Sequence, residues 1–168
     1  MKEALLIDKE IVALMRRLYG TDDQRTLEAE TSLAVSLRRQ GGEVNLKSAL
    51  QTLTRVHELK IELLGRDEVS TLDTASYLAE TYKDLGCVAE ATKRRREVLA
   101  GRRRTLGENH AQTLHSYALY AGTLCLQRNF GEAREIYDQV RPVAMRVLGP
   151  DHRTTLCWDV LRRKYLER

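Results

Sequence analysis

Residues 63–72 read LLGRDEVSTL, and the same arrangement occurs three more times in the chain. The related stretches are LYGTDDQRTL at 18–27, TLGENHAQTL at 105–114 and VLGPDHRTTL at 147–156. Each has a glycine followed, six residues later, by a Thr-Leu pair. The glycines are 45, 42 and 42 residues apart at Gly20, Gly65, Gly107 and Gly149. A fixed period of this length predicts an array of structural repeats.

The motif itself combines a helix end with a helix start. Glycine adopts the left-handed conformation that ends a helix at little steric cost. Two residues after each glycine stands a side chain that can accept hydrogen bonds from the first turn of a new helix. These predicted caps are Asp22, Asp67, Asn109 and Asp151. The motif therefore predicts the boundary between two consecutive helices.

A second break occurs inside the repeats, at Gly41-Gly42, at Gly86 and at Arg128-Asn129. Each full repeat is thus predicted to contain a helix A, a short turn and a helix B, and stacking is needed to bury their apolar faces. We predict an all-α fold, a right-handed α-solenoid of stacked antiparallel helix hairpins, forming a single domain over residues 1–168. Its repeats would span 1–20 (helix B only), 21–65, 66–107, 108–149 and 150–168 (helix A only).

Composition narrows the function classes. No stretch approaches the roughly 20 apolar residues that cross a bilayer, and charges are spread through the first 20 residues, so neither a membrane span nor a signal peptide is predicted. Three cysteines without paired spacing, Cys87, Cys125 and Cys157, favour a reducing compartment and hence a cytoplasmic location. Common hydrolase, phosphate-loop and metalloenzyme motifs are absent. We therefore predict no catalytic residue, no metal site and no cofactor.

The repeats resemble the 42-residue tetratricopeptide repeats of kinesin light chains, whose units run roughly Leu-Gly-x-x-His-Pro-x-Thr-Leu, then Asn-Leu-Ala, then Gly-x-x-x-Glu-Ala. The matching residues are His110 and His152, Leu33-Ala34, Leu78-Ala79, Glu90-Ala91 and Glu132-Ala133. The resemblance covers nearly the whole chain and implies a scaffold that binds a protein or peptide. The two histidines recur with the repeat, so we expect them to have a structural role at helix starts.

In this family the A helices line a concave groove. The resemblance implies partner contacts at Arg38, Asp73, Tyr77, Glu80, Lys83, His115 and Leu119. Further groove positions are Glu28, Thr31, Ser32, Val35, Arg39, Ser76, Asp84, Ala118, Gly122, Cys125 and Leu126. The family asparagine before Leu-Ala is replaced by Ser32, Tyr77, Leu119 and Leu161, so carriage of peptides in the manner of kinesin light chains is not implied. The alternative interpretation of the charged positions is a solvated helix face.

A basic run over residues 93–104 holds seven basic residues and one acid, although the whole chain is only +4. Its candidate contacts are Arg94, Arg95, Arg96, Arg102, Arg103 and Arg104. Superposing the repeats puts Arg95 and Arg102 on the core side, so one interpretation is that their stems pack along the core. The alternatives are electrostatic docking of an acidic or polyanionic partner, including nucleic acid or anionic lipid, and a nuclear-import signal. The run lacks the aromatic residues that stack on bases, which argues against nucleic acid.

The two ends of the array differ. Residues 3–19 carry more apolar side chains than one neighbouring hairpin should cover, namely Leu5, Leu6, Ile7, Ile11, Val12, Leu14, Met15 and Leu18. This excess predicts either a fragment of a longer chain or a homodimer, and hence a structural or dimerisation role as an alternative function. Near the other end, Arg162 and Arg163 replace the Leu-Ala pair, which predicts a polar cap.

Overall fold

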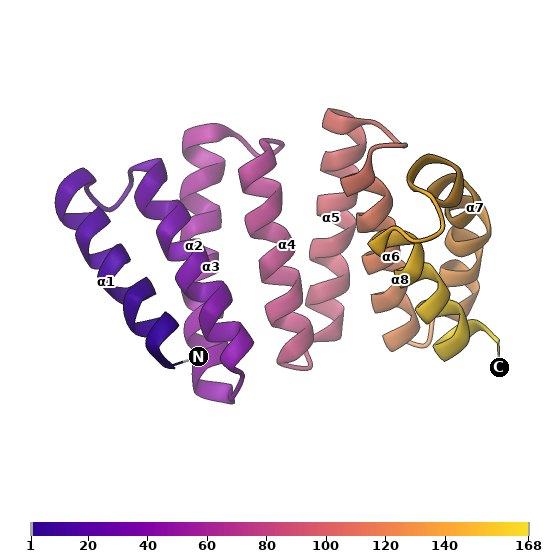
Figure 1. Ribbon diagram of the computed structural model, residues 1–168, viewed down its shortest axis with the longest axis horizontal. Coiled ribbons are helices and arrows are strands. Elements are labelled where there is room, and N and C mark those ends of the chain that lie inside the picture. The colour runs from indigo at the N-terminus through magenta and orange to yellow at the C-terminus, as the bar shows by residue number, and fades with distance from the viewer. Residues whose placement is uncertain (1, 168) are drawn as a thin grey trace. The chain divides into compact units, whose positions relative to one another are not determined.

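The computed structural model describes the backbone of residues 2–167 and the side chains of residues 5–167 (Figure 1). Every regular element in this range is helical. The elements are α1 Lys2–Tyr19, α2 Gln24–Gln40, α3 Glu43–Leu64, α4 Val69–Asp84, α5 Val88–Leu106, α6 Ala111–Leu126, α7 Phe130–Leu148, α8 Arg153–Leu161 and the π-helix η1 Arg162–Leu166. The prediction of an all-α fold made of antiparallel helix hairpins is confirmed.

The helices form two compact units, Met1–Cys87 and Val88–Arg168. In the first unit α1, α2, α3 and α4 pack in chain order, each helix against the next (Figure 1). In the second unit α5, α6 and α7 pack in the same way, while α8 contacts both α6 and α7. Packing between consecutive helices is what the hairpin pattern predicts.

The repeat motif ends one helix and starts the next, but the capping residue lies one position later than predicted. The N-caps are Asp23, Glu68, His110 and His152, instead of Asp22, Asp67, Asn109 and Asp151. At His110 the ring Nδ1 accepts the Gln112 amide at 3.2 Å. The chain needs all three residues after the glycine to reverse direction, and only then reaches the extended conformation from which a side chain can turn back to the first helical turn. The repeated histidines therefore have the structural role expected of them.

The threonine of each Thr-Leu pair joins a new helix to the end of the preceding one. The Thr26 hydroxyl donates to the carbonyl of Gly20 at 2.7 Å, and Thr155 donates to Gly149 at 2.8 Å. Both threonines are fully buried. A buried carbonyl at a helix end needs such a donor, which explains why a polar residue recurs inside the core.

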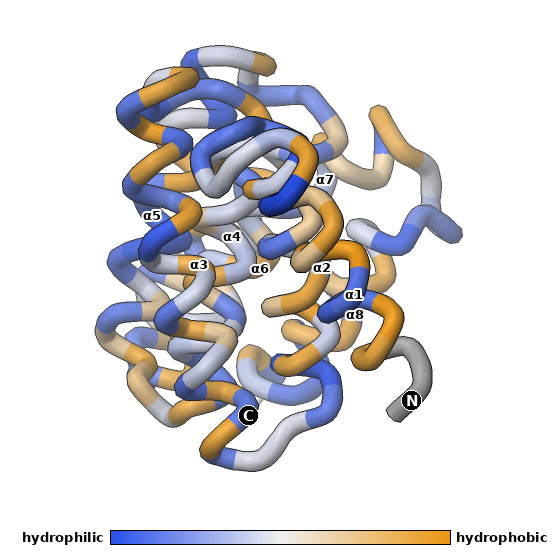
Figure 2. The backbone as a smooth tube through the Cα atoms, turned by 90° about the vertical axis from the view of Figure 1, so that its left-hand side faces the viewer, coloured by the Kyte–Doolittle hydropathy of each residue, from blue (hydrophilic) through white to orange (hydrophobic). Residues whose placement is uncertain are grey.

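The apolar faces of the helices form a separate core in each unit, and hydrophobic and hydrophilic residues alternate along the helices (Figure 2). The core of the first unit contains a cluster of Ala34, Leu37, Ala49, Leu53 and Leu78, and Leu27, Val56, Leu72, Ala75 and Ala79 are buried as well. The core of the second unit is larger and is centred on the fully buried Trp158. The Trp158 ring meets Tyr137 edge to face, with the ring centroids 6.0 Å apart.

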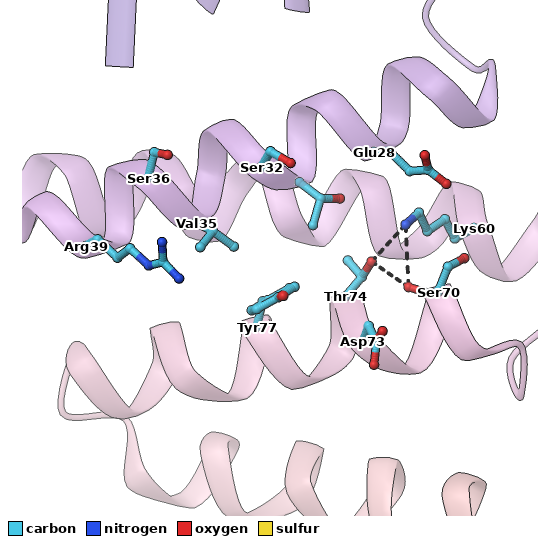
Figure 3. A pocket seen from close by; sticks show the side chains of 11 residues that line it. Glu28, Ser32, Val35, Ser36, Arg39, Lys60, Ser70, Asp73, Thr74 and Tyr77 are labelled. Carbon is cyan, nitrogen blue, oxygen red and sulfur yellow. Dashed lines mark hydrogen bonds between the residues drawn. The ribbon is translucent and has the colours of Figure 1, made fainter. Parts of the chain in front are cut away.

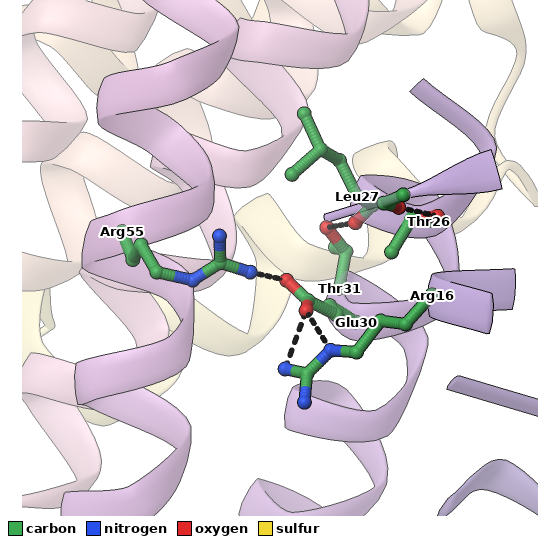
Figure 4. Close-up of polar contacts among 7 residues, drawn as sticks. Arg16, Thr26, Leu27, Glu30, Thr31 and Arg55 are labelled. Atoms are coloured by element: carbon green, nitrogen blue, oxygen red, sulfur yellow. Dashed lines mark hydrogen bonds and ion pairs between the residues drawn. The ribbon is translucent and has the colours of Figure 1, made fainter. Parts of the chain in front are cut away.

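A buried carboxylate connects three helices of the first unit. Glu30 on α2 is inaccessible to solvent and binds Arg16 of α1 and Arg55 of α3 (Figure 4). Arg16 makes two hydrogen bonds to one carboxylate oxygen, at 2.9 and 2.6 Å, while Arg55 binds the other oxygen. Full pairing is what makes a charge tolerable in this interior.

The side of α1 that faces away from α2 remains apolar and exposed. Five side chains there are between 40% and 59% accessible, namely Leu6, Ile7, Ile11, Leu14 and Leu18. Only Val12 on this helix is fully buried among the described side chains. The excess of apolar surface predicted for residues 3–19 is thus present over the part whose side chains are described. No helix within residues 2–167 is both long enough and apolar enough to cross a bilayer.

Candidate functional site

The first unit contains a hollow of about 370 Å³ between α2 and α4 (Figure 3). Helix α2 contributes Glu28, Thr31, Ser32, Val35, Ser36 and Arg39, and α4 contributes Ser70, Asp73, Thr74 and Tyr77. A volume of this size lies at the lower end of the range of small-ligand sites. The lining is mainly polar, so the hollow is suited to hydrogen-bonding groups.

Helical periodicity explains why these side chains lie together. Along α2 the lining positions are three or four residues apart, which puts them on one face of the helix. The same spacing on α4 aligns Ser70, Asp73 or Thr74, and Tyr77. These faces look away from α3, which contributes a single lining side chain, Lys60. Several lining positions are groove positions implied by the family resemblance, including Asp73 and Tyr77.

Lys60 is the unusual member of this hollow, because its side chain is only 3% exposed. Its ammonium group donates to the Thr74 hydroxyl at 3.2 Å and to the Ser70 carbonyl at 3.4 Å (Figure 3). Burial lowers the pKa of Lys60, and the negative charges of Glu28, Asp73 and Glu68 partly oppose that change. The structure therefore holds a cation at the back of the hollow with neutral hydrogen-bond acceptors.

The hydroxyl of Ser70 adds a second polar group at the same place. Its oxygen is buried and has no hydrogen-bond partner among the described residues. A buried hydroxyl costs free energy unless a partner satisfies it. Lys60 and Ser70 together give the back of the hollow unused capacity to donate hydrogen bonds.

Other predicted groove residues form ion pairs with one another or with neighbouring residues of the first unit. Arg38 on α2 binds Glu80 at 2.7 Å and Asp84 at 2.8 Å, both on α4. The ammonium of Lys83 lies 3.4 Å from Asp84. The two Arg38 pairs connect the A helices α2 and α4, whereas the Lys83–Asp84 pair lies within α4. Neither Arg38 nor Glu80 lines the hollow.

The remaining predicted groove residues lie on α6 in the second unit, where His115, Leu119 and Gly122 are half-buried and Leu126 is exposed. Ala118 and Cys125 are buried in the core of this unit, so a partner cannot reach them in a groove. None of these α6 residues is part of the hollow between α2 and α4. Contact of any other predicted groove residue with a partner stays a prediction.

In the basic run, burial separates the arginines into two groups. Arg95 and Arg102 are only 5% and 6% exposed, in agreement with the register of the repeats, and Arg102 donates to the Ser116 hydroxyl at 2.8 Å. The other four reach solvent to differing degrees. Of these, Arg94 binds Glu97 at 3.1 Å and Arg103 binds Glu108 at 2.6 Å. Docking of an acidic partner on this run stays a prediction, and the basic residues that reach solvent are Lys93, Arg94, Arg96, Arg103 and Arg104.

Two tyrosines of α6, Tyr117 and Tyr120, form hydrogen bonds with residues of the basic run or with their acidic partners. The Arg96 guanidinium donates to the Tyr120 hydroxyl at 3.1 Å, and that hydroxyl donates to Glu132 at 2.8 Å. Tyr117 donates to Glu108 at 2.7 Å, and partial burial together with this hydrogen bond raises the pKa of Tyr117 to about 12. Both hydroxyls act as structural donors at neutral pH.

Two buried charges were missed in the sequence, Glu30 and Lys60. For Lys60 a signal existed, since it is one repeat before the buried Arg102 and therefore on the core side of α3. For Glu30 no comparable signal was available, because its arginine partners lie on two other helices. Among the side chains of residues 5–167, no group of three or more His, Cys, Asp or Glu is arranged to hold a metal ion.

Known proteins share both the repeat and the fold. The family model of the tetratricopeptide repeat matches residues 70–144. The clustered mitochondria protein homolog of Candida albicans is 26% identical over 157 residues, which is 91% of this chain but 11% of that protein. The chain thus spans a small part of the length of that relative.

Two solved structures have the same fold. The crystal structure of nearly identical TPR-like repeats from a Podospora anserina kinesin light chain is 23% identical, with a TM-score of 0.81 over 95% of this chain and 74% of that one. BtubC (BKLC) from P. vanneervenii is 18% identical, with a TM-score of 0.76 over 96% of this chain and 65% of that one. At these identities the likeness establishes the fold.

Proposed function

We propose, from the match of residues 70–144 to the tetratricopeptide-repeat family model, that the chain is an interaction module whose first unit binds a segment of a partner protein in the hollow between α2 and α4. The role is one of binding and not of catalysis. Three thiols without disulfide partners, Cys87, Cys125 and Cys157, suit a reducing compartment, so the proposal locates this binding in the cytoplasm.

The polar hollow is the observation that carries the proposal. Ordinary helix packing buries apolar side chains, yet here two A helices leave a space of about 370 Å³ lined by hydroxyls, charges and the ring of Tyr77. A segment of polypeptide offers both the backbone groups that Lys60 and Ser70 can bond and side chains that can pack on Tyr77 and Val35. The lining contains two acids, Glu28 and Asp73, and two bases, Arg39 and Lys60, which favours a polar partner segment over an apolar one.

Selection of peptides from a random library on the immobilised chain tests this proposal. Substituting Ser32→Arg fills the hollow from an exposed position of α2 and leaves the core untouched. Selected peptides should lose at least about tenfold in affinity for this variant, because the inserted side chain occupies their site. Titration calorimetry would measure the loss.

The matched control is Ser48→Arg, the same change at an exposed position of α3 that does not line the hollow. Peptides should bind this variant as they bind the unsubstituted chain. Selected peptides whose affinity is unchanged by Ser32→Arg would show that the hollow is not the site.

A second candidate function is self-association through α1, and a specific pattern favours it. The exposed Ile7, Ile11, Leu14 and Leu18 follow a 4-3-4 spacing, which is the seam of a two-helix contact. Light scattering coupled to size exclusion should then give twice the 19.3 kDa chain mass, and Ile11→Arg should return it to the single mass. A single mass for the unsubstituted chain at micromolar concentration would remove this candidate.

A further inference from the structure

A second hollow, of about 370 Å³, lies within the second unit and is distinct from the proposed groove. It is lined by Arg128, Phe130, Arg134, Lys164 and Tyr165. Arg128 belongs to the turn before α7, Phe130 and Arg134 to the first turns of α7, and the other two residues to η1. Three cations and two aromatic rings therefore converge on one cavity.

No carboxylate lines this cavity, and two of the nearby acids, Glu132 and Glu167, bind other residues. Glu132 accepts hydrogen bonds from Tyr120 and Asn129, each at 2.8 Å. Glu167 binds Arg162 at 2.8 Å. Asp138 and Glu167 line a neighbouring hollow together with Arg134, so Arg134 borders acids on one side and the carboxylate-free cavity on the other. Uncompensated positive charge in a concave site attracts an anion.

The cations of the cavity retain donors for such an anion. Arg134 donates one guanidinium hydrogen to the backbone carbonyl of Leu166, which leaves most of its five donors available and holds the side chain in place. Arginine binds phosphate with paired, charge-assisted hydrogen bonds. The N-terminus of α7, which begins at Phe130, adds a favourable field for negative charge.

Arg128 is held in a costly backbone conformation. Its φ of +63° makes it the single residue other than glycine with positive φ in the described chain. One repeat earlier the same position is Gly86, with a φ of +80°. A side chain is disfavoured in this region, and strained residues of this kind concentrate at functional sites. A cation is therefore kept where glycine would be more stable.

The aromatic rings define the rest of the ligand. The Phe130 ring is 42% exposed, and the ammonium of Lys164 lies 5.0 Å from the centroid of the Tyr165 ring. The π-helix makes this arrangement by a wide turn in which the Glu167 amide bonds the Arg162 carbonyl at 3.1 Å. Such turns are often found at functional sites. Flat aromatic surfaces beside cations suit a ligand that is itself aromatic and anionic.

We propose that this cavity binds an aryl phosphate, with the phosphate held by Arg128, Arg134 and Lys164 and the ring packed against Phe130 and Tyr165. Two sources share this chemistry, a free aryl phosphate and a phosphotyrosine side chain of a partner. The site is independent of the hollow between α2 and α4, so either can fail without the other.

NMR titration of the ¹⁵N-labelled chain with phenyl phosphate tests the proposal at fixed ionic strength. Amides of residues 128–134 and 162–166 should shift with a dissociation constant of about 1 mM, as expected for a ligand of this size. Inorganic phosphate and phenol should each bind at least about tenfold more weakly, because each lacks one half of the recognised group. A short phosphotyrosyl peptide that binds more tightly than phenyl phosphate would identify the source as a partner protein, and equal binding would identify a free ligand.

The variant Arg128→Gly separates binding from folding. It should weaken phenyl phosphate binding about five- to tenfold, while raising the midpoint of thermal unfolding by about 2–4 °C through relief of the strained φ. Arg146→Gln, which removes an exposed charge of α7 outside the cavity, should change neither. Binding that survives Arg128→Gly, inorganic phosphate binding as tightly as phenyl phosphate, or an absence of shifts in these amides at about 10 mM ligand would each overturn the proposal.

Discussion

The junction of α3 with α4 in the first unit and the junction of α7 with α8 in the second are equivalent places in the repeat that are filled with opposite chemistry. In the first, buried Lys60 bonds the hydroxyl of Thr74 at 3.2 Å. At the equivalent positions two repeats later stand Ala144 and Trp158, both fully buried in an apolar core. The long Lys60 side chain and its small partner Thr74 are thus replaced by the small Ala144 side chain and its large partner Trp158.

The intermediate repeat supports this interpretation, because Arg102 and Ser116 occupy the same two positions and are bonded at 2.8 Å. The repeat therefore fixes the volume to be filled at this junction and leaves its polarity open. In the first unit, the version with a cation and a hydroxyl also lines the polar hollow. The difference between the junctions teaches that the chemistry of a groove can change while the packing of the repeats is kept.

The largest effect is expected at the apolar junction. Trp158→Ala should lower the free energy of unfolding by about 4 kcal/mol, because it leaves a large cavity. Thr74→Ala at the polar junction should cost only about 1–2 kcal/mol, because it removes the hydroxyl that accepts from Lys60 and donates to the Ser70 carbonyl. Urea unfolding followed by circular dichroism would measure both. Equal losses would contradict the contrast between the junctions.

Trp158→Phe is the matched control for that cavity. The indole nitrogen of Trp158 has no hydrogen-bond partner among the described residues, so phenylalanine loses volume but no bond. Its cost should be well below that of alanine. A loss as large as that of Trp158→Ala would show that the indole nitrogen has a role which the core packing does not explain.

The next largest effect is expected when the buried carboxylate of Glu30 in the first unit is removed. Glu30→Ala should cost about 3 kcal/mol at most, since it removes the shared partner of Arg16 and Arg55. The loss is limited because both arginine side chains are already 40–51% exposed and can turn to water. Glu62→Ala, at an exposed position of α3 outside the hollow, is the control and should be nearly neutral. Guanidinium unfolding curves of the two variants would compare them directly.

Lys60→Met should stabilise the chain by about 1 kcal/mol at pH 7, because it replaces a buried cation, hydrogen-bonded to the neutral Thr74 hydroxyl and Ser70 carbonyl, with an apolar side chain of similar length. The pKa of Lys60 is lowered in the folded chain from 10.5. Between the two pKa values the unfolded chain binds more protons, so the stability of the lysine form rises with pH. The advantage of methionine should therefore shrink as the pH approaches 10. Urea midpoints that diverge over this range would contradict the assignment.

The smallest net effect is expected when the polar junction is converted into the apolar one. Thr74→Trp alone should overpack the site and cost about 1–3 kcal/mol. Combined with Lys60→Ala it should recover most of that loss, because the two changes reproduce the pair found at Ala144 and Trp158. A thermodynamic double-mutant cycle measures this coupling. Additive losses would show that the two junctions are not interchangeable.

Much of the fold was predictable because its signals are local. The glycines, the Thr-Leu pairs and the apolar spacing predict where helices end, begin and bury a face. The positions of the N-caps were wrong by one residue, since the length of the turn after each glycine depends on how the chain reverses and not on the capping side chain alone. His110 and His152 became caps as a result.

The sequence predicted which helix face carries the candidate site, but not how its side chains pair. Repeat register put Asp73 and Tyr77 on the groove side of α4, and both line the hollow. Register could not show that Arg38 is paired with Glu80 at 2.7 Å, because this contact depends on the distance and angle between two helices that are not neighbours in the chain.

The sequence by itself determined the repeat period, the helical class and the side of each helix that faces the core, since capping and hydrophobic periodicity act within a few residues. Only the tertiary structure decided which charges are buried and with whom. Glu30 meets its two arginines, Lys60 reaches the back of the hollow, and the wide turn of η1 brings Lys164 beside α7. These contacts join residues from separate helices, and their energies depend on distances that no local pattern encodes.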